Sequence, residues 1–209
     1  IRAWDEHPTS IEKLAMVKFL LDEGADVNAK CVKNNFYRTP ILDAIENLDS
    51  WYEGRRKGQE IVRILLSYGA SLDLIPWKKS YTGAGCVQFS PFIGALKENC
   101  FDLAAFMLLS GHLNLHAAKL QLVEMFPNPN ATSSEGAFCS WALDMSTQPI
   151  SLKIQCRVAI RNHFCQNNIH LRKIRMMQLP TRIVDFIMLQ SADMESTFFD
   201  HLESDEDED

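Results

Sequence analysis

The sequence predicts an all-α protein in which a solenoid of helical repeats is followed by a bundle of three short helices. Two observations carry this prediction. A helical stretch that ends in glycine recurs three times before residue 116, and a stripe of apolar residues at helical spacing follows residue 150. The composition agrees, because 46% of the 209 residues are apolar and 23% are charged, which is typical of a folded globular chain.

The repeated segment is an apolar stretch with helical spacing that runs up to a glycine, after which a shorter extended stretch follows. It covers residues 17–28, 62–73 and 104–115. The glycines are Gly24, Gly69 and Gly111. Glycine suits the end of a helix because it adopts a left-handed backbone conformation without steric cost. Each segment therefore predicts a helix that ends at its glycine.

A second signature opens two of the repeats. Thr39-Pro40 and Ser90-Pro91 each precede an apolar stretch. Hydroxyl side chains cap helices, and proline fits the first helical turn because its missing N–H is not needed there. We therefore expect Thr39 and Ser90 to cap helices that begin at the following proline.

These signatures together resemble the ankyrin repeat, with its Thr-Pro opening and its Gly-Ala-Asp-Val-Asn close. The resemblance implies that residues 1–146 form an ankyrin-repeat solenoid. Its units fall near residues 3–30, 36–75 and 87–117, with a degenerate cap at 118–146. The sequence begins at Ile1 without a signal-peptide pattern, so we expect it to be the cut end of a longer chain.

Ankyrin units bind partners and rarely carry out chemistry, so the resemblance implies a protein-binding surface on the concave face and hairpin tips. Aromatic and arginine side chains dominate binding hot spots. Those expected on the tip and on two insertions are candidates for contact with an unknown protein substrate: Phe36, Tyr37, Arg38, Trp51, Arg55, Arg56, Trp77 and Tyr81. The alternative is that the tryptophans pack the insertions onto the solenoid.

The segment after residue 148 predicts an amphipathic helix. Leu152, Cys156 and Ile160 recur at i, i+4 and i+8, which places them along one stripe of a helix. The basic side chains are expected on the neighbouring, solvated face: Lys153, Arg157 and Arg161. Further short helices follow, and three helices in forty residues cannot bury their apolar faces alone. They need the solenoid, a partner, or both.

This segment resembles a SOCS box over residues 147–190. The family motif of Ser/Thr-Leu, a cysteine four residues after the leucine and an aliphatic residue four further on matches Ser151-Leu152, Cys156 and Ile160. The resemblance implies that Leu152, Cys156 and Ile160 bind elongin C, which pairs with elongin B. Leu152 would be the main anchor, and Cys156 would act as a small apolar residue.

The second half of this segment resembles a cullin box. The matching residues are Leu179, Pro180, Ile183, Phe186 and Ile187, which the resemblance implies as cullin contacts. The earlier of the family's two prolines falls at position 178, where this chain has Gln178 instead. The implied partner is cullin-5 in preference to cullin-2, together with its RING protein.

The whole chain therefore resembles an ankyrin repeat and SOCS box protein. The resemblance implies a substrate-recognition subunit of an elongin B/C–cullin–RING ubiquitin ligase, which holds a target near the ubiquitin-conjugating enzyme without catalysing a reaction. A rival hypothesis is a plain ankyrin scaffold or inhibitor with no ligase role. We expect it to be cytoplasmic or nuclear.

Other function classes find little support. The sequence lacks P-loop, G-x-S-x-G, G-x-G-x-x-G and H-E-x-x-H motifs, so we expect no catalytic residues and no cofactor. Its six cysteines are scattered, which argues against a metal site. No apolar run is long enough to cross a membrane. The basic block at 157–182 lacks interleaved aromatics, so we expect no nucleic-acid binding. The acidic residues 191–209 predict a disordered tail.

Overall fold

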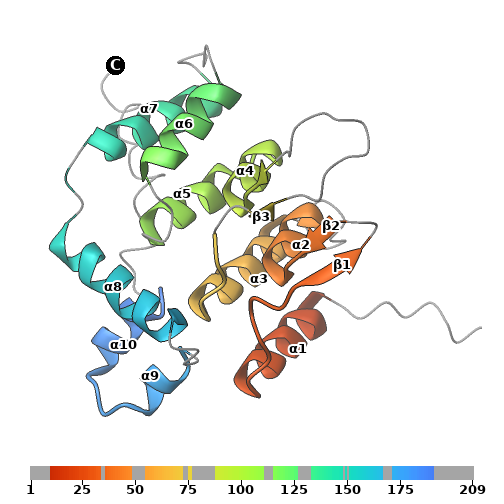
Figure 1. The fold of residues 1–209 in the computed structure, drawn as a ribbon, viewed down its shortest axis with the longest axis vertical. Helices are drawn as coiled ribbons and strands as arrows, with labels where there is room; N and C mark the ends of the chain where they lie inside the picture. Colours follow the sequence, from red (N-terminus) through yellow and green to blue (C-terminus); the bar gives the residue numbers. More distant parts are fainter. Residues whose placement is uncertain are drawn as a thin grey trace, which may run out of the picture.

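The computed structural model shows a stack of helical hairpins with three further helices packed against one side of it (Figure 1). The described residues are 10–33, 36–48, 55–72, 75–76, 88–110, 115–126, 133–147, 149, 151–166 and 171–190. The expected acidic tail at 191–209 lies outside them. The helical fold class is confirmed, with two short β-hairpins added.

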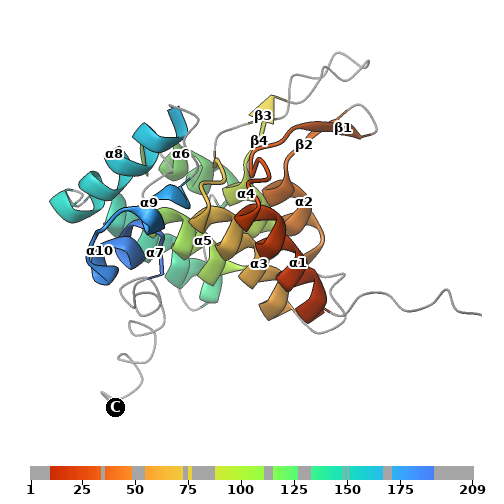
Figure 2. The same ribbon diagram turned by 90° about the horizontal axis from the view of Figure 1, so that it is seen from below.

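The stack contains the repeated helices in chain order. They are α1 (Ser10–Asp22), α2 (Pro40–Glu46), α3 (Arg55–Ser67), α4 (Pro91–Lys97), α5 (Phe101–Ser110), α6 (Leu115–Met125) and α7 (Ser134–Thr147). Two antiparallel hairpins connect them: β1 (Cys31–Lys33) with β2 (Phe36–Arg38), and β3 (Ile75–Pro76) with β4 (Gln88–Phe89). Both hairpins lie along the same edge of the stack (Figure 2).

The turn signals act largely as the sequence predicts. Gly24 and Gly69 follow the ends of α1 and α3 with φ of 94° and 97°, the left-handed region that glycine tolerates best. Ser90 caps α4, because its hydroxyl accepts a hydrogen bond from the Ile93 N–H at 3.1 Å. Thr39 occupies the same N-cap position before α2, and its carbonyl accepts a hydrogen bond from the Asp43 N–H at 3.0 Å. Its buried hydroxyl makes no hydrogen bond, so the predicted position is confirmed but the side-chain capping bond is absent.

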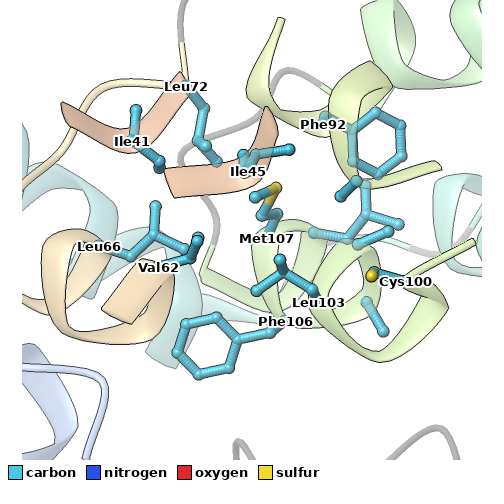
Figure 3. Close-up of a cluster of buried hydrophobic side chains, with 14 of the residues drawn as sticks. Ile41, Ile45, Val62, Leu66, Leu72, Phe92, Cys100, Leu103, Phe106 and Met107 are labelled. Carbon is cyan, nitrogen blue, oxygen red and sulfur yellow. The ribbon is translucent and has the colours of Figure 1, made fainter. Parts of the chain in front are cut away.

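The core of the stack lies between the paired helices, and Figure 3 shows its centre. Side chains from α2, α3, α4 and α5 interleave there, among them Ile45, Leu66, Phe92 and Met107. The same core continues into α7, where the ring centroid of Phe138 lies 5.3 Å from that of Phe101. Because each hairpin buries its apolar face against the next, the stack forms one continuous hydrophobic core.

The remaining helices are α8 (Leu152–Gln166), α9 (Lys173–Met176) and α10 (Thr181–Ile187). They have a small core of their own, built from Phe164, Leu171, Ile174, Ile187 and Met188. Leu189, just after α10, belongs instead to the main core of the stack. In Figure 1, α8 passes along the C-terminal ends of α3 and α5. The C-terminal helices therefore pack directly against the stack of helical hairpins, which is called the solenoid below.

Candidate docking site on helix α8

Helix α8 begins directly after Ser151. The Ser151 carbonyl accepts a hydrogen bond from the Gln155 N–H at 3.0 Å, and its hydroxyl accepts one from the Ile154 N–H at 3.4 Å. A serine that satisfies N–H groups of the first turn is a typical helix cap. This cap sets the start of α8, so that Leu152 is its first residue.

One face of α8 is apolar and open to solvent. The side chain of Leu152 is 74% exposed and that of Ile160 is 37% exposed. Cys156 lies between them as an exposed free thiol. The three residues follow each other at intervals of four, so they form one stripe along the helix. An exposed stripe of this kind gains about 25 cal/mol for each Å² of apolar surface that a partner covers.

The neighbouring face of α8 is buried, contrary to the expectation that its arginines are solvated. Arg157 is 2% exposed and Arg161 is 0% exposed. Arg157 donates a hydrogen bond to the carbonyl of Leu109 in α5. Arg161 donates to the carbonyls of Leu66 and, at 3.4 Å, Ser67 in α3. Only Lys153 of the three basic residues is exposed.

The carbonyl groups at the ends of helices explain why these arginines are buried. The last four carbonyls of a helix have no partner within it, and the end of the helix carries a partial negative charge that attracts cations. Arg161 also donates to the carbonyl of Ile187 at 2.7 Å, at the end of α10. The ends of α3, α5 and α10 therefore supply acceptors that offset part of the cost of removing these guanidinium groups from water.

Phe186 of α10 helps to hold α8 in place. Its ring lies under the Lys153 ammonium, at 4.9 Å from the centroid, and under the Arg157 guanidinium, at 4.8 Å. Both distances are within the range of cation–π attraction. Phe186 is therefore only partly exposed, and it links α10 to the buried side of α8.

Of the five residues expected to contact a cullin, three are exposed, whereas Phe186 is half-buried against α8 and Ile187 is buried. Leu179, Pro180 and Ile183 are exposed around the start of α10. Ile187 is 2% exposed and packs in the small core of the C-terminal helices. It therefore supports α10 from inside, and the expectation that its side chain faces a partner is corrected. Two further exposed apolar side chains, Met176 and Met177, come shortly before these residues in the chain, and the sequence analysis assigned neither of them to this site.

The residues expected to bind a substrate can be followed only in part. Arg38 forms ion pairs with Asp43, at 3.1 Å, and with Glu46 of α2, so its charge is neutralised within the chain. Phe36 and Tyr37 lie in β2, and Arg55 and Arg56 lie in the first turn of α3, although their side chains are not among the described ones. Trp51, Trp77 and Tyr81 lie outside the described residues.

A second exposed apolar surface lies on α1, where Met16, Phe19 and Leu20 are exposed. The repeat register aligns these positions with Ile61, Ile64 and Leu65 of α3 and with Leu103, Phe106 and Met107 of α5, which are buried or half-buried between consecutive hairpins. A cavity of about 480 Å³ lies beside this surface, between α1, α2 and α3. The surface therefore has the composition of a contact between two repeat units.

Other kinds of site are absent from the part of the chain that the structure describes. No group of three or more metal-ligating side chains comes together among those residues. None of the described helices is long and apolar enough to cross a membrane. The exposed apolar stripe of α8 is the site that the sequence motif and the geometry indicate together.

Comparison with known proteins identifies the C-terminal segment as a protein-docking module. Residues 148–188 match the family model of the SOCS box, so α8, α9 and α10 form a SOCS box. The SOCS box is the motif by which proteins join elongins B and C and a cullin in ubiquitin ligases. The match does not extend to the helical hairpins, whose ankyrin character stays a prediction. No curated protein and no solved structure matched the chain.

Proposed function

We propose that this chain is the substrate-recognition subunit of an elongin B/C–cullin–RING E3 ubiquitin ligase. One observation carries the proposal. The three motif residues of a SOCS box helix, Leu152, Cys156 and Ile160, are exposed together, while the adjoining face of the same helix is packed against the solenoid. An apolar stripe that the chain leaves open is the expected property of a partner-binding surface.

Docking through this stripe explains the residue types. Leu152 stands at the start of α8 and is the most exposed of the three, so it has the freedom to enter an apolar pocket of elongin C. Cys156 is small and weakly polar, so it allows the surface of elongin C to approach α8 closely. Ile160 extends the contact by one further turn.

The surface around α10 is the proposed cullin contact. Leu179, Pro180 and Ile183 are exposed around the start of α10, and Met176 and Met177 precede them in the chain. We assign cullin-5 as the partner, with its RING protein. Because Gln178 replaces a proline of the family motif that bears on the choice of cullin, binding of cullin-2 is the control measurement.

The helical hairpins would then hold the substrate. Stacked ankyrin-type units present hairpin tips and helix faces to a protein partner. The ligase acts by holding a lysine of the substrate near the charged conjugating enzyme, which raises the effective concentration of the two reactants. No covalent chemistry is required of this chain.

Size-exclusion chromatography with recombinant elongins B and C tests the proposal. We expect the wild-type chain to co-elute with them, and the double variant Leu152→Asp/Cys156→Phe to elute separately. Leu120→Asp is a matched control, because Leu120 is an exposed leucine on α6, far along the chain from α8. It should co-elute like the wild type. Circular dichroism checks that all variants are folded.

Two results would overturn the proposal. Elution of the wild-type chain apart from the elongins would leave a scaffold or inhibitor without a ligase role as the better account. Co-elution of the double variant would show that the elongins contact a different face of the chain.

A further inference from the structure

The buried arginines of α8 contact equivalent positions in successive repeats. In the repeat register, Ser67 and Leu109 both lie two residues before the repeat glycine. The Ser67 carbonyl accepts a hydrogen bond from Arg161, and the Leu109 carbonyl accepts one from Arg157. The two arginines are four residues apart, so one turn of α8 matches one step of the solenoid.

The dimensions of helices make this match possible. Four residues advance a helix by about 6 Å, whereas the axes of packed helices lie about 8–10 Å apart. The long side chains of Arg157 and Arg161 cover the difference, because each ends in a planar group with several donors. A side chain that is shorter than arginine, or that ends in a single donor, would not reach from α8 to the carbonyl groups at the ends of α3 and α5.

A third arginine continues the pattern beyond α8. Arg172, just before α9, lies against Gly24, the glycine that follows α1. A Cβ atom built on Gly24 would lie 3.1 Å from Arg172 Nη2. Each of three successive helix ends is therefore contacted by one arginine of the SOCS box. Arg172 contacts the end of α1, Arg161 the end of α3 and Arg157 the end of α5.

Fixing one side of a helix fixes the direction of the other sides. Arg157, Arg161 and Phe164 form the inward stripe of α8, and each of the first two directly follows a residue of the outward stripe, Cys156 or Ile160. Because one residue is a rotation of about 100°, anchoring the arginines directs the outward stripe away from the solenoid.

We propose that Arg157 and Arg161 are positioning residues that lock the SOCS box to the repeat solenoid in a single orientation. They hold the substrate-binding and elongin-binding parts as one rigid unit before any partner arrives. Only the functional consequence of this inference rests on the proposed function. The consequence is that the bound substrate lies at a constant distance from the elongin-binding surface and the rest of the ligase. The rigid attachment itself is a property of the free chain.

Pulsed electron paramagnetic resonance on the free chain tests the attachment. Spin labels are placed at Glu60 of α3 and Asn162 of α8, two exposed positions, on ketone-bearing amino acids that leave the native thiols unmodified. We expect one narrow distance distribution for the wild type. The double variant Arg157→Met/Arg161→Met should broaden it about twofold or more, because helices without fixed contacts sample several orientations.

Two further variants keep this test decisive. Arg161→Lys retains the buried charge but has no planar fork with which to reach several carbonyls, so it should fold and give an intermediate width. Arg182→Met removes an exposed arginine of α10 and should give the wild-type width. An unchanged width in both Arg161→Lys and the double variant would overturn the proposal.

Elongin binding and ubiquitin transfer are measured on the same variants. We expect the arginine variants to bind elongins B and C within about threefold of wild type, because their substitutions do not touch the outward stripe. The set of lysines that the assembled ligase modifies on this chain should become wider. If the wild type fails to bind elongins, the proposed function fails, while the distance measurement still decides the attachment. If the width increases and the modified lysines stay the same, the functional consequence is refuted.

Discussion

Replacement of Arg161 by methionine should lower the stability of the chain substantially. Arg161 is fully buried and donates to three carbonyl groups, those of Leu66, Ser67 and Ile187. Hydrogen bonds that involve a charged group contribute about 1.5–3 kcal/mol each. Methionine is apolar and matches the aliphatic part of arginine, so it fills the space of that part but leaves the acceptors without this donor.

The net effect is smaller than the sum of three bonds. The guanidinium group loses its hydration when it is buried, and its removal recovers part of that cost. Only the carbonyl groups that find no other donor retain the full free-energy cost of a buried acceptor without a hydrogen bond. We therefore expect Arg161→Met to reduce the free energy of unfolding by about 3 kcal/mol. For a chain of about 200 residues this corresponds to a fall in Tm of about 6–12 °C.

Urea unfolding followed by circular dichroism measures this loss, with Arg182→Met as the comparison. Arg182 is exposed on α10, so its replacement should change the free energy of unfolding by less than about 0.5 kcal/mol. An Arg161→Met variant as stable as Arg182→Met would refute the reasoning. It would mean that apolar packing replaces the three hydrogen bonds at no cost.

Three further predictions concern the solenoid. Gly69→Ala should lower the free energy of unfolding by about 1–2 kcal/mol, because Gly69 has a φ of 97°; thermal unfolding measures the loss, and an unchanged Tm would contradict it. Asn28→Ala should cost about 1–2 kcal/mol in urea unfolding, since the Asn28 amide donates to the Gly69 carbonyl and accepts from the Ser71 N–H; no change in midpoint would show that water replaces both bonds. Burial and the hydrogen bond to Asp22 raise the pKa of Tyr68 to about 12, above the value of about 10 expected in the unfolded chain. The neutral phenol is therefore favoured by folding, so this contribution is complete below pH 10 and is lost as the pH rises towards 12. The stability difference between wild type and Tyr68→Phe should shrink over that interval in urea titrations, and a constant difference would contradict the assignment.

Local signals in the sequence predict local structure well. Gly24 and Gly69 mark the ends of helices because few other residues tolerate their backbone angles, and both have positive φ in the structure. The spacing of Leu152, Cys156 and Ile160 predicts one stripe of α8, and the three residues are exposed together. In each case the evidence lies within a few residues of the feature.

Features that depend on distant partners could not be read from the sequence. Arginine is normally exposed, so Arg157 and Arg161 are naturally assigned to solvent. They are buried because the ends of α3 and α5, some 50 to 95 residues away in the chain, supply carbonyl acceptors. Ile187 shows the same limit, since only the packing of α8 and α9 decides that it faces inward.

The proposed function requires that the outward stripe of α8 is a docking surface for elongin C. Isothermal titration of the purified chain with elongins B and C measures this directly, using the wild type and Leu152→Ala. We predict one binding site, and an affinity that falls about 10- to 100-fold in the variant, because the covered part of a leucine side chain contributes about 1.5–3 kcal/mol. Equal affinities for the two proteins, or no heat of binding for the wild type, would contradict the account.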